Sequence, residues 1–284
     1  MDICDDWEPT EKMLELNDIA KEKNLLALLG LGASPGITNL LGRIAIDHLD
    51  IAHTIYTGWN LEEAQPEPIS SQKETNAAMI HGIEQITGKV KVLKDGKFEM
   101  VNPLEEIKVS YPNIGTYSAF IFGHPEAITF PYHFEDLLNS INLAHGNKST
   151  IFVLKIMRKL INLKILTKKT AARFLEWLEK KGTSRKYTET TSLPEIYALA
   201  IGFKNGKEEC VGVSLDGEPS RELTMGEATG YPLSLGFKMF LNNEITERGV
   251  IAPESKCIDH KKLLMEIYEL FGMKDAKIKV NKSW

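Results

Sequence analysis

The chain has little cysteine and no long apolar run. Its 284 residues include three cysteines, Cys4, Cys210 and Cys257, an odd number without the close spacing of metal ligands. Such usage predicts a reduced, cytoplasmic compartment rather than a disulfide-linked scaffold. No apolar segment reaches the roughly 20 residues that cross a bilayer, and the acidic stretch 1–11 does not resemble a signal peptide. We therefore expect a cytoplasmic protein with no membrane partner.

Signatures of several enzyme classes are also missing. The sequence contains no phosphate-binding loop, no zinc-ligand spacing and no Ser-His-Asp order, so kinase and hydrolase functions have no support. We expect no metal ion. The net charge of −5 argues against a general nucleic-acid binder. With 43% hydrophobic and 26% charged residues, the composition is that of a globular protein, long enough for one large domain or two.

The stretch from Leu25 to Asn39 predicts a strand, a tight glycine turn and the start of a helix. The apolar run 25–31 is typical of a strand buried on both faces. Ser34 is expected to cap the helix and Pro35 to occupy its first position. Such a turn places unpaired N–H groups at the carboxyl edge of a sheet, where ligands bind. An ordinary connection without a ligand is the alternative.

Three segments carry a family resemblance. Gly-Ala-Ser-Pro-Gly-Ile-Thr-Asn at 32–39 resembles the Pro-Gly segment of the saccharopine dehydrogenase (saccharopine reductase) superfamily. Gly-His-Pro-Glu at 123–126, followed by Ala-Ile-Thr-Phe, resembles that family's His-Pro-Glu strand pair. Thr-Gly-Tyr-Pro at 229–232, with Glu-Arg-Gly-Val-Ile-Ala-Pro-Glu at 247–254, resembles its C-terminal signature. The three occur in the family's order and span most of the chain.

The resemblance implies an α/β plus α+β architecture. Residues 1–33 would be the C-terminal part of a Rossmann dinucleotide-binding domain, and 34–284 a substrate and dimerisation domain with a mixed or antiparallel sheet. In that family a glycine-rich half precedes the part matching 1–31, yet no Gly-x-Gly-x-x-Gly occurs here, since Gly30-Leu-Gly32 continues as Ala-Ser-Pro. The sequence therefore predicts a truncated or split version.

The implied activity is NAD(P)-dependent oxidation or reduction at the CH–NH bond of an amino-acid-derived imine or secondary amine. NAD(P) would serve the complete protein, and this chain alone is expected to bind it weakly or not at all. The expected partners are an amino-acid-type substrate, a second copy in a homodimer, and possibly a separate nucleotide-binding half. A non-catalytic dimeric ligand-binding protein is the alternative, as is one subunit of a split dehydrogenase.

Local patterns predict the remaining elements. Asp95-Gly96 and Asn205-Gly206 each join two strand patterns and predict β-hairpins over 90–100 and 196–214. The sequence further predicts helices over 9–20, 76–85 and 260–271 and after Pro232, strands at 1–7, 54–57, 117–122 and 127–130, and a loop over 61–72. Hairpins mixed with helices favour an α+β domain on a largely antiparallel sheet.

Residues 151–186 predict a basic helical insertion. Apolar residues recur there at helical spacing, among eleven Lys/Arg and only two acids, Glu176 and Glu179. Such a surface could attract an acidic substrate or a phosphate. The alternative is a solvated amphipathic helix pair.

The catalytic candidates are His81 and Glu126. His81 lies on the apolar face of a predicted helix, where it is either a catalytic group or a buried histidine bonded to a backbone carbonyl. Glu126, with His124, flanks Pro125 and either orients an amine or fixes a turn. Glu254, after Pro253, has the same two interpretations.

Further binding residues are proposed from the turn patterns and the resemblance. Asp6 and Trp7 border the substrate in the family, although Asp5 and Asp6 could simply cap the helix before Pro9. Thr229-Gly230-Tyr231 precedes a predicted helix start, which is a possible anion site. The cofactor candidates are Gly32, Ser34, Pro35 and Gly36, and the substrate candidates are Asp6, Trp7, Asn39, Thr229, Gly230 and Tyr231.

Overall fold

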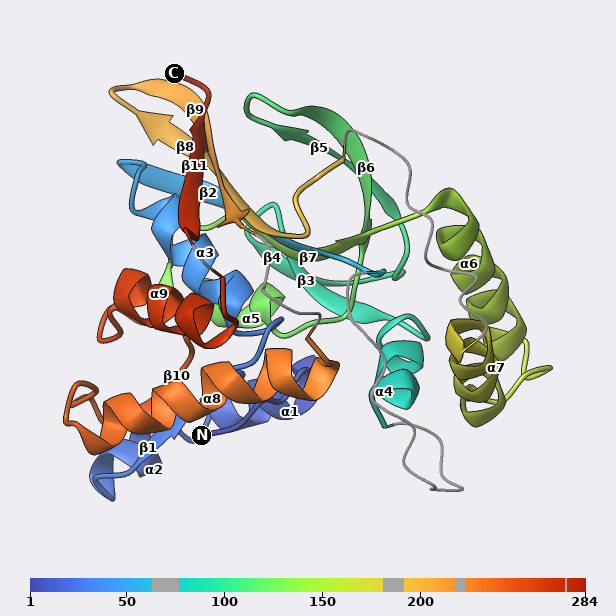
Figure 1. The fold of residues 1–284 in the computed structure, drawn as a ribbon, viewed down its shortest axis with the longest axis horizontal. Coiled ribbons are helices and arrows are strands. Elements are labelled where there is room, and N and C mark those ends of the chain that lie inside the picture. The colour runs from blue at the N-terminus through green and yellow to red at the C-terminus, as the bar shows by residue number, and fades with distance from the viewer. Residues whose placement is uncertain (63–76, 181–191, 218–222, 274) are drawn as a thin grey trace.

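A computed structural model describes residues 1–62, 77–180, 192–217, 223–273 and 275–284 (Figure 1). Its helices are α1 (Trp7–Leu14), α2 (Asn17–Glu22), α3 (Ile37–Ile46), α4 (Ala77–Gln85), α5 (Glu126–His133), α6 (Lys148–Asn162), α7 (Lys168–Lys180), α8 (Met225–Leu241) and α9 (His260–Leu270). Its strands are β1 (Leu26–Leu28), β2 (Ile51–Asn60), β3 (Val90–Lys94), β4 (Lys97–Val101), β5 (Glu106–Tyr111), β6 (Gly115–Ile121), β7 (Asn139–His145), β8 (Ile196–Lys204), β9 (Lys207–Asp216), β10 (Gly249–Ile251) and β11 (Lys277–Lys282).

Nine of these strands form one mixed sheet. The strand order is β11-β9-β8-β2-β7-β3-β4, and β6 joins β7 and carries β5. Only β2 and β7 run parallel, and every other pairing in this sheet is antiparallel. Both predicted hairpins are confirmed, because Asp95-Gly96 and Asn205-Gly206 have the positive φ angles that two-residue turns require.

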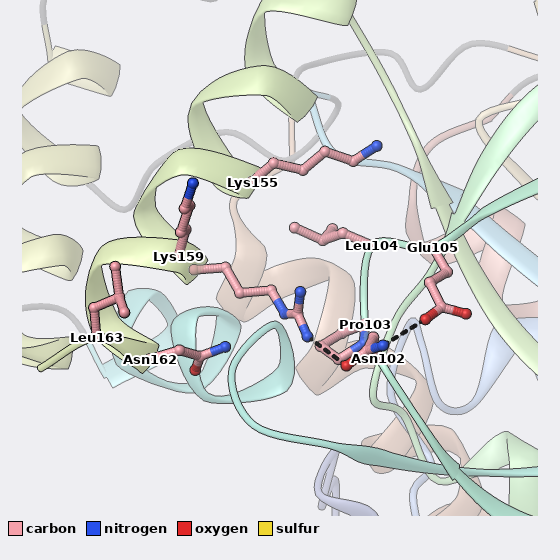
Figure 2. Close-up of a pocket in the computed structure, with 9 residues that line it drawn as sticks. Asn102, Pro103, Leu104, Glu105, Lys155, Lys159, Asn162 and Leu163 are labelled. Carbon is pink, nitrogen blue, oxygen red and sulfur yellow. Dashed lines mark hydrogen bonds between the residues drawn. The ribbon is translucent and has the colours of Figure 1, made fainter.

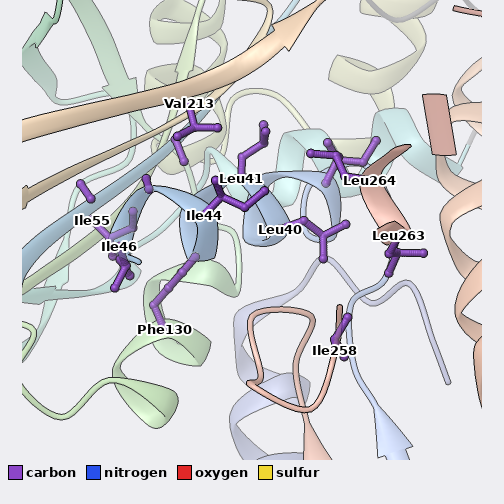
Figure 3. Close-up of a cluster of buried hydrophobic side chains, with 14 of the residues drawn as sticks. Leu40, Leu41, Ile44, Ile46, Ile55, Phe130, Val213, Ile258, Leu263 and Leu264 are labelled. Carbon is purple, nitrogen blue, oxygen red and sulfur yellow. The ribbon is translucent and has the colours of Figure 1, made fainter. Parts of the chain in front are cut away.

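One face of the sheet is covered by helices. The apolar side of α3 packs Leu41 and Ile44 toward Val213 of β9, and α9 adds Leu263 and Leu264 (Figure 3). The opposite face of β8 is buried too, since Tyr197 and Leu199 pack with residues of β5 and β6 within the same chain. Both faces of β8 are thus covered within one chain, and the homodimer stays a prediction.

A second, two-stranded sheet ties the beginning of the chain to its last quarter. Leu26–Leu28 of β1 pairs in parallel with Gly249–Ile251 of β10. Residues 1–6 form no strand, contrary to expectation, although Asp2 exchanges backbone hydrogen bonds with Leu28 and Leu31. The division into domains at residue 33 stays a prediction.

Several predicted elements need correction. The segment 127–130 is helical, within α5; its residues are all buried in the core and pair with no strand among the described residues. The helix expected over 9–20 is two helices, α1 and α2. Helix α8 begins at Met225, not after Pro232, because Thr224 caps it. The insertion is a helix pair, α6 and α7, as predicted, while 63–72 and 181–186 lie outside the described residues.

Candidate functional site

A cluster of buried polar side chains lies beneath the glycine turn. It is formed where the start of α3, the start of α5, the middle of β7 and the segment after β10 meet. Its buried members are Thr38, Asn39, His124, Glu126, Thr129, Asn142 and Glu254, and the half-buried Ser34 completes it. Two carboxyl groups within such a cluster demand an explanation, since burying a charge is costly unless it is paired and hydrogen-bonded.

The turn itself is closed by its own hydrogen bonds. Gly36, not Ser34, is the N-cap of α3, and its N–H donates to Asn39 Oδ1 at 2.8 Å. The next two N–H groups, of Ile37 and Thr38, donate to the carbonyls of Gly32 and Ala33. The N–H of Gly32 donates to the Pro35 carbonyl at 2.9 Å. The expectation of unpaired N–H groups at this helix start is therefore wrong for Gly32, Gly36, Ile37 and Thr38.

This pairing bears on the cofactor candidates. Gly32, Ser34, Pro35 and Gly36 do lie together, but dinucleotide pyrophosphates bind to free amide groups at a helix start. Here those amides already have partners. The glycine turn, as it stands in the structure, does not fit the pyrophosphate of NAD(P).

Ser34 and Glu126 are in direct contact. The Ser34 hydroxyl donates to Glu126 Oε1 at 2.7 Å, an oxygen that also accepts from Thr38 Oγ1 at 2.8 Å and Asn142 Nδ2 at 3.0 Å. Three donors on one oxygen stabilise a carboxylate. The other oxygen, Oε2, is buried and lacks a hydrogen-bond partner among the described residues.

His124 adds a second acceptor for the Ser34 proton. Gln85 Nε2 donates to the Asp5 carbonyl at 3.1 Å, which leaves Gln85 Oε1 to accept from His124 Nε2 at 3.1 Å. With the proton on Nε2, a neutral His124 has an acceptor at Nδ1, 3.1 Å from Ser34 Oγ and 3.7 Å from Glu126 Oε2. Ser34 can therefore donate to either group. The arrangement can pass a proton between a carboxylate and an imidazole.

Glu254 is the second buried carboxyl. Asn39 Nδ2 donates to its Oε2 at 2.8 Å, while Oε1 has no hydrogen-bond partner among the described residues. Burial raises the pKa of Glu254 to about 7, and the charge of Glu126 adds to the rise, against hydrogen bonds from Thr129 and Asn39. Asn39 thus joins the turn to Glu254 through its two amide atoms.

Asp5, Asp6 and His81 form a half-exposed group at the rim. His81 Nδ1 lies 3.3 Å from Asp6 Oδ2 and 3.6 Å from Asp5 Oδ1. The His81 side chain is 43% exposed, so the interpretation as a buried histidine bonded to a carbonyl is wrong. Asp6 occupies the N-cap position of α1 but its side chain makes no capping bond. Burial and the neighbouring Asp5 raise the pKa of Asp6.

These three side chains also offer metal-ligand atoms within 4.8 Å of one another. Among the described residues, no other group of three or more His, Cys, Asp or Glu side chains comes this close together. From the sequence we expect no metal ion here. The expectation itself stays a prediction.

The remaining candidates lie at the start of α1 and within α8. Trp7 is the first residue of α1, next to Asp6, and the methyl group of Thr229 lies against Gly32. Gly230 and Tyr231 lie inside α8, so they do not form a helix start; Tyr231 packs on Phe271 and donates from its hydroxyl to Glu227 at 3.4 Å. The anion site expected at 229–231 is therefore not formed as predicted.

Sequence reasoning missed Asn142 and Gln85. Asn142 was detectable, because it is a fully buried amide in the apolar strand β7, where a polar side chain needs a partner. Gln85 carried no signal, since the last residue of an amphipathic helix is often polar.

No protein-family model matches the chain, and no curated protein matches it in sequence. Among solved structures it is similar to apo histidine-tagged saccharopine dehydrogenase (L-Glu forming) from Saccharomyces cerevisiae. The TM-score is 0.55 at 13% identity, over 95% of this chain and 77% of that chain. At this identity the likeness shows the fold. The mixed sheet with its covering helices thus resembles the saccharopine dehydrogenase fold.

Proposed function

We propose that this chain supplies the substrate-binding and proton-transferring part of an oxidoreductase that acts on the CH–NH bond of an amino-acid-derived imine or secondary amine. The observation that carries the proposal is the buried Ser34–Glu126–His124 contact, on a fold shared with a saccharopine dehydrogenase. Reactions at such a bond require a proton to be given to or taken from nitrogen. A hydroxyl between a carboxylate and an imidazole is suited to that task.

The rim supplies the charge that an amino-acid substrate needs. Asp5 and Asp6 present two carboxyl groups beside the half-exposed His81, and the ammonium group of a substrate would bind to them by charge-assisted hydrogen bonds. Ser34 is the half-buried member of the cluster and so is the one that a substrate can reach. NAD(P) would supply the hydride in the complete protein. The glycine turn does not fit the pyrophosphate of NAD(P). The proposed proton transfer therefore uses only side chains of this chain and does not depend on the cofactor.

A non-catalytic ligand-binding protein is the second candidate. The paired amides of the glycine turn favour it, because a chain that only holds an amino-acid ligand has no need of a pyrophosphate site.

Calorimetric titration of the chain with saccharopine, and separately with NADPH, tests the proposal. We expect one saccharopine site per chain, weakened at least tenfold by Ser34→Ala or Glu126→Gln and unchanged by Ser118→Ala on β6, and no NADPH binding in the micromolar range. Absence of any saccharopine binding would overturn the proposed substrate class. Micromolar NADPH binding would show that the cofactor conclusion is wrong. Saccharopine turnover with NAD+ or NADP+, measured with the chain joined to a nucleotide-binding half, then separates the oxidoreductase from the ligand-binding protein.

A further inference from the structure

A cavity lies between helix α6 and the connection from β4 to β5, away from the polar cluster (Figure 2). Its volume is about 460 Å³, within the range of small-molecule sites. Asn102, Leu104 and Glu105 line it from the connection, and Lys155, Arg158 and Lys159 line it from α6.

The charges around this cavity are unequal. Lys155, Arg158 and Lys159 stand three and four residues apart, so a single stretch of α6 presents all three cations. Glu105 is the one acid in the lining, and it accepts a hydrogen bond from Asn102 Nδ2 at 2.7 Å. Neither Lys155 nor Lys159 has a carboxylate within ion-pair distance among the described residues. The lining therefore keeps an excess of positive charge.

Arg158 is held in place by a hydrogen bond, but one of its N–H donors lacks a partner in the part of the chain that the structure describes. Its Nη2 donates to Asn102 Oδ1 at 3.0 Å, and Asn102 is in turn held by Glu105. Its Nε is buried and has no hydrogen-bond partner among the described residues. A buried donor without a partner is unfavourable, and an oxyanion bound to the guanidinium would supply that partner. Lys155 extends over the Phe120 ring, with its Nζ 4.7 Å from the ring centroid.

A second cavity of about 710 Å³ continues along α6 and shares Lys155 with the first. Lys148 lines it, as does Lys108, which is paired with Glu106 of the same lining at 2.7 Å. Lys148 thus adds positive charge beyond the first cavity.

We propose that this cavity binds a small dianion, a phosphate or a dicarboxylate, with Arg158 as its principal contact. The planar guanidinium pairs with two oxygens of such a group, and the two lysines neutralise the second charge. Leu104 and Pro103 form an apolar floor that suits a short carbon body. The site is independent of the function proposed above, because no residue of the Ser34–Glu126–His124 cluster takes part in it.

Titration of the full chain with inorganic phosphate and with succinate, followed by calorimetry at low salt, tests this site. We expect one site per chain for at least one probe, weakened at least tenfold by Arg158→Gln and several-fold by Lys159→Gln. Arg158→Lys should give an intermediate loss, because it keeps the charge and removes the fork. The matched control is Lys169→Gln on α7, outside both linings, for which affinity should change less than twofold.

The probe that binds identifies the source of the oxyanion, phosphate esters or dicarboxylates. Lack of binding by both probes at millimolar concentration would refute the site. So would equal losses in Lys159→Gln and Lys169→Gln, which would indicate unspecific attraction to a basic surface. Because Lys159 is exposed, Lys159→Gln should leave the fold intact. The comparison of Lys159→Gln with Lys169→Gln therefore tests the site even if Arg158→Gln lowers the melting temperature.

Discussion

Gly36 has a φ of +129°, and a side chain there would collide with the backbone of Gly32. The positive φ and the collision each disfavour every residue other than glycine at this position. We therefore expect Gly36→Ala to lower the free energy of unfolding by about 2 kcal/mol or more. Urea denaturation measures the loss. Gly82→Ala is the control, since Gly82 lies in α4 with no atom near its missing Cβ, and alanine there should be neutral or slightly stabilising.

A Gly36→Ala variant with a normal melt would contradict the closed turn described above. It would instead favour the ligand-facing alternative, in which any loss is confined to binding.

Glu254 makes stability depend on pH. Because its folded pKa is raised from 4.5 to about 7, its contribution is fully present below pH 4.5 and is lost as the pH rises through 7. Two histidines, the buried His260 and the half-buried His133, act in the opposite sense: burial lowers their folded pKa to about 4, and their contribution is lost as the pH falls from 6.5 through 4. Because two histidines oppose one carboxyl group between pH 4.5 and 6.5, stability should peak near pH 6.5.

Glu254→Gln should remove the contribution of Glu254, so that between pH 4.5 and 8 the variant gains on the order of 3 kcal/mol in unfolding free energy relative to the wild type. Urea melts of both proteins across that range measure the difference. Glu99→Gln, on the exposed strand β4, should follow the wild-type pH profile. A wild-type profile in Glu254→Gln would place the ionising group elsewhere.

At this scale the sequence located the site better than it described it. The motif residues Ser34, Asn39, Glu126 and Glu254 do come together, as one cluster. Their contacts could not be predicted, because they join positions up to 215 apart in sequence, as with Asn39 and Glu254. Local capping rules predicted that Ser34 caps the helix, but its hydroxyl instead contacts Glu126 and His124.

At the scale of elements, hairpins were predictable and α5 was not. Asp-Gly and Asn-Gly determine a turn locally. Ala-Ile-Thr-Phe at 127–130 has β-branched and aromatic residues that favour a strand, yet these residues form a helical turn that is buried on all sides. Packing against the sheet overrides such weak preferences.

The start of α8 provides a test at this scale. Thr224 Oγ1 accepts from the Glu227 N–H at 3.2 Å, and Glu227 returns a bond to the Thr224 N–H at 3.1 Å. Thr224→Ala should therefore cost about 1 kcal/mol of unfolding free energy in urea melts. Ser234→Ala, inside the same helix and exposed, should cost less. Equal small losses would mean that the helix begins later, near Pro232, as the sequence alone suggested.

At the scale of the molecule, the family resemblance predicts a dimer. The structure covers both faces of β8 within one chain, so a dimer must use another surface. Strand β4 ends the sheet among the described residues, and Phe98 and Met100 on it are 47% and 49% exposed. Exposed edge strands with apolar side chains favour association.

We therefore expect sedimentation at micromolar concentration to give twice the 31.9 kDa of one chain, and Met100→Lys to shift it toward the monomer. Lys207→Glu, on the distant hairpin of β8 and β9, is the control. A mass near 31.9 kDa for the wild-type protein would show that the prediction of a dimer is wrong.

None of the helices within the described residues combines the length and apolar character that a bilayer crossing needs. The sheet class, an α+β mixture with mainly antiparallel pairing, followed from local patterns. The parallel pair of β1 and β10 did not, because a three-residue strand has no pattern that specifies a partner so far along the chain.

That pairing has a consequence for biosynthesis. Leu28 pairs with Ile251 across about 220 residues, so the ribosome must add these residues before β1 finds its partner. At roughly 5–20 residues per second, this takes about 10 to 45 s. Meanwhile the leucines at 28, 29 and 31, all buried in the finished molecule, lack the segment that pairs with β1. The segment around β1 is thus open to nascent-chain chaperones throughout that interval.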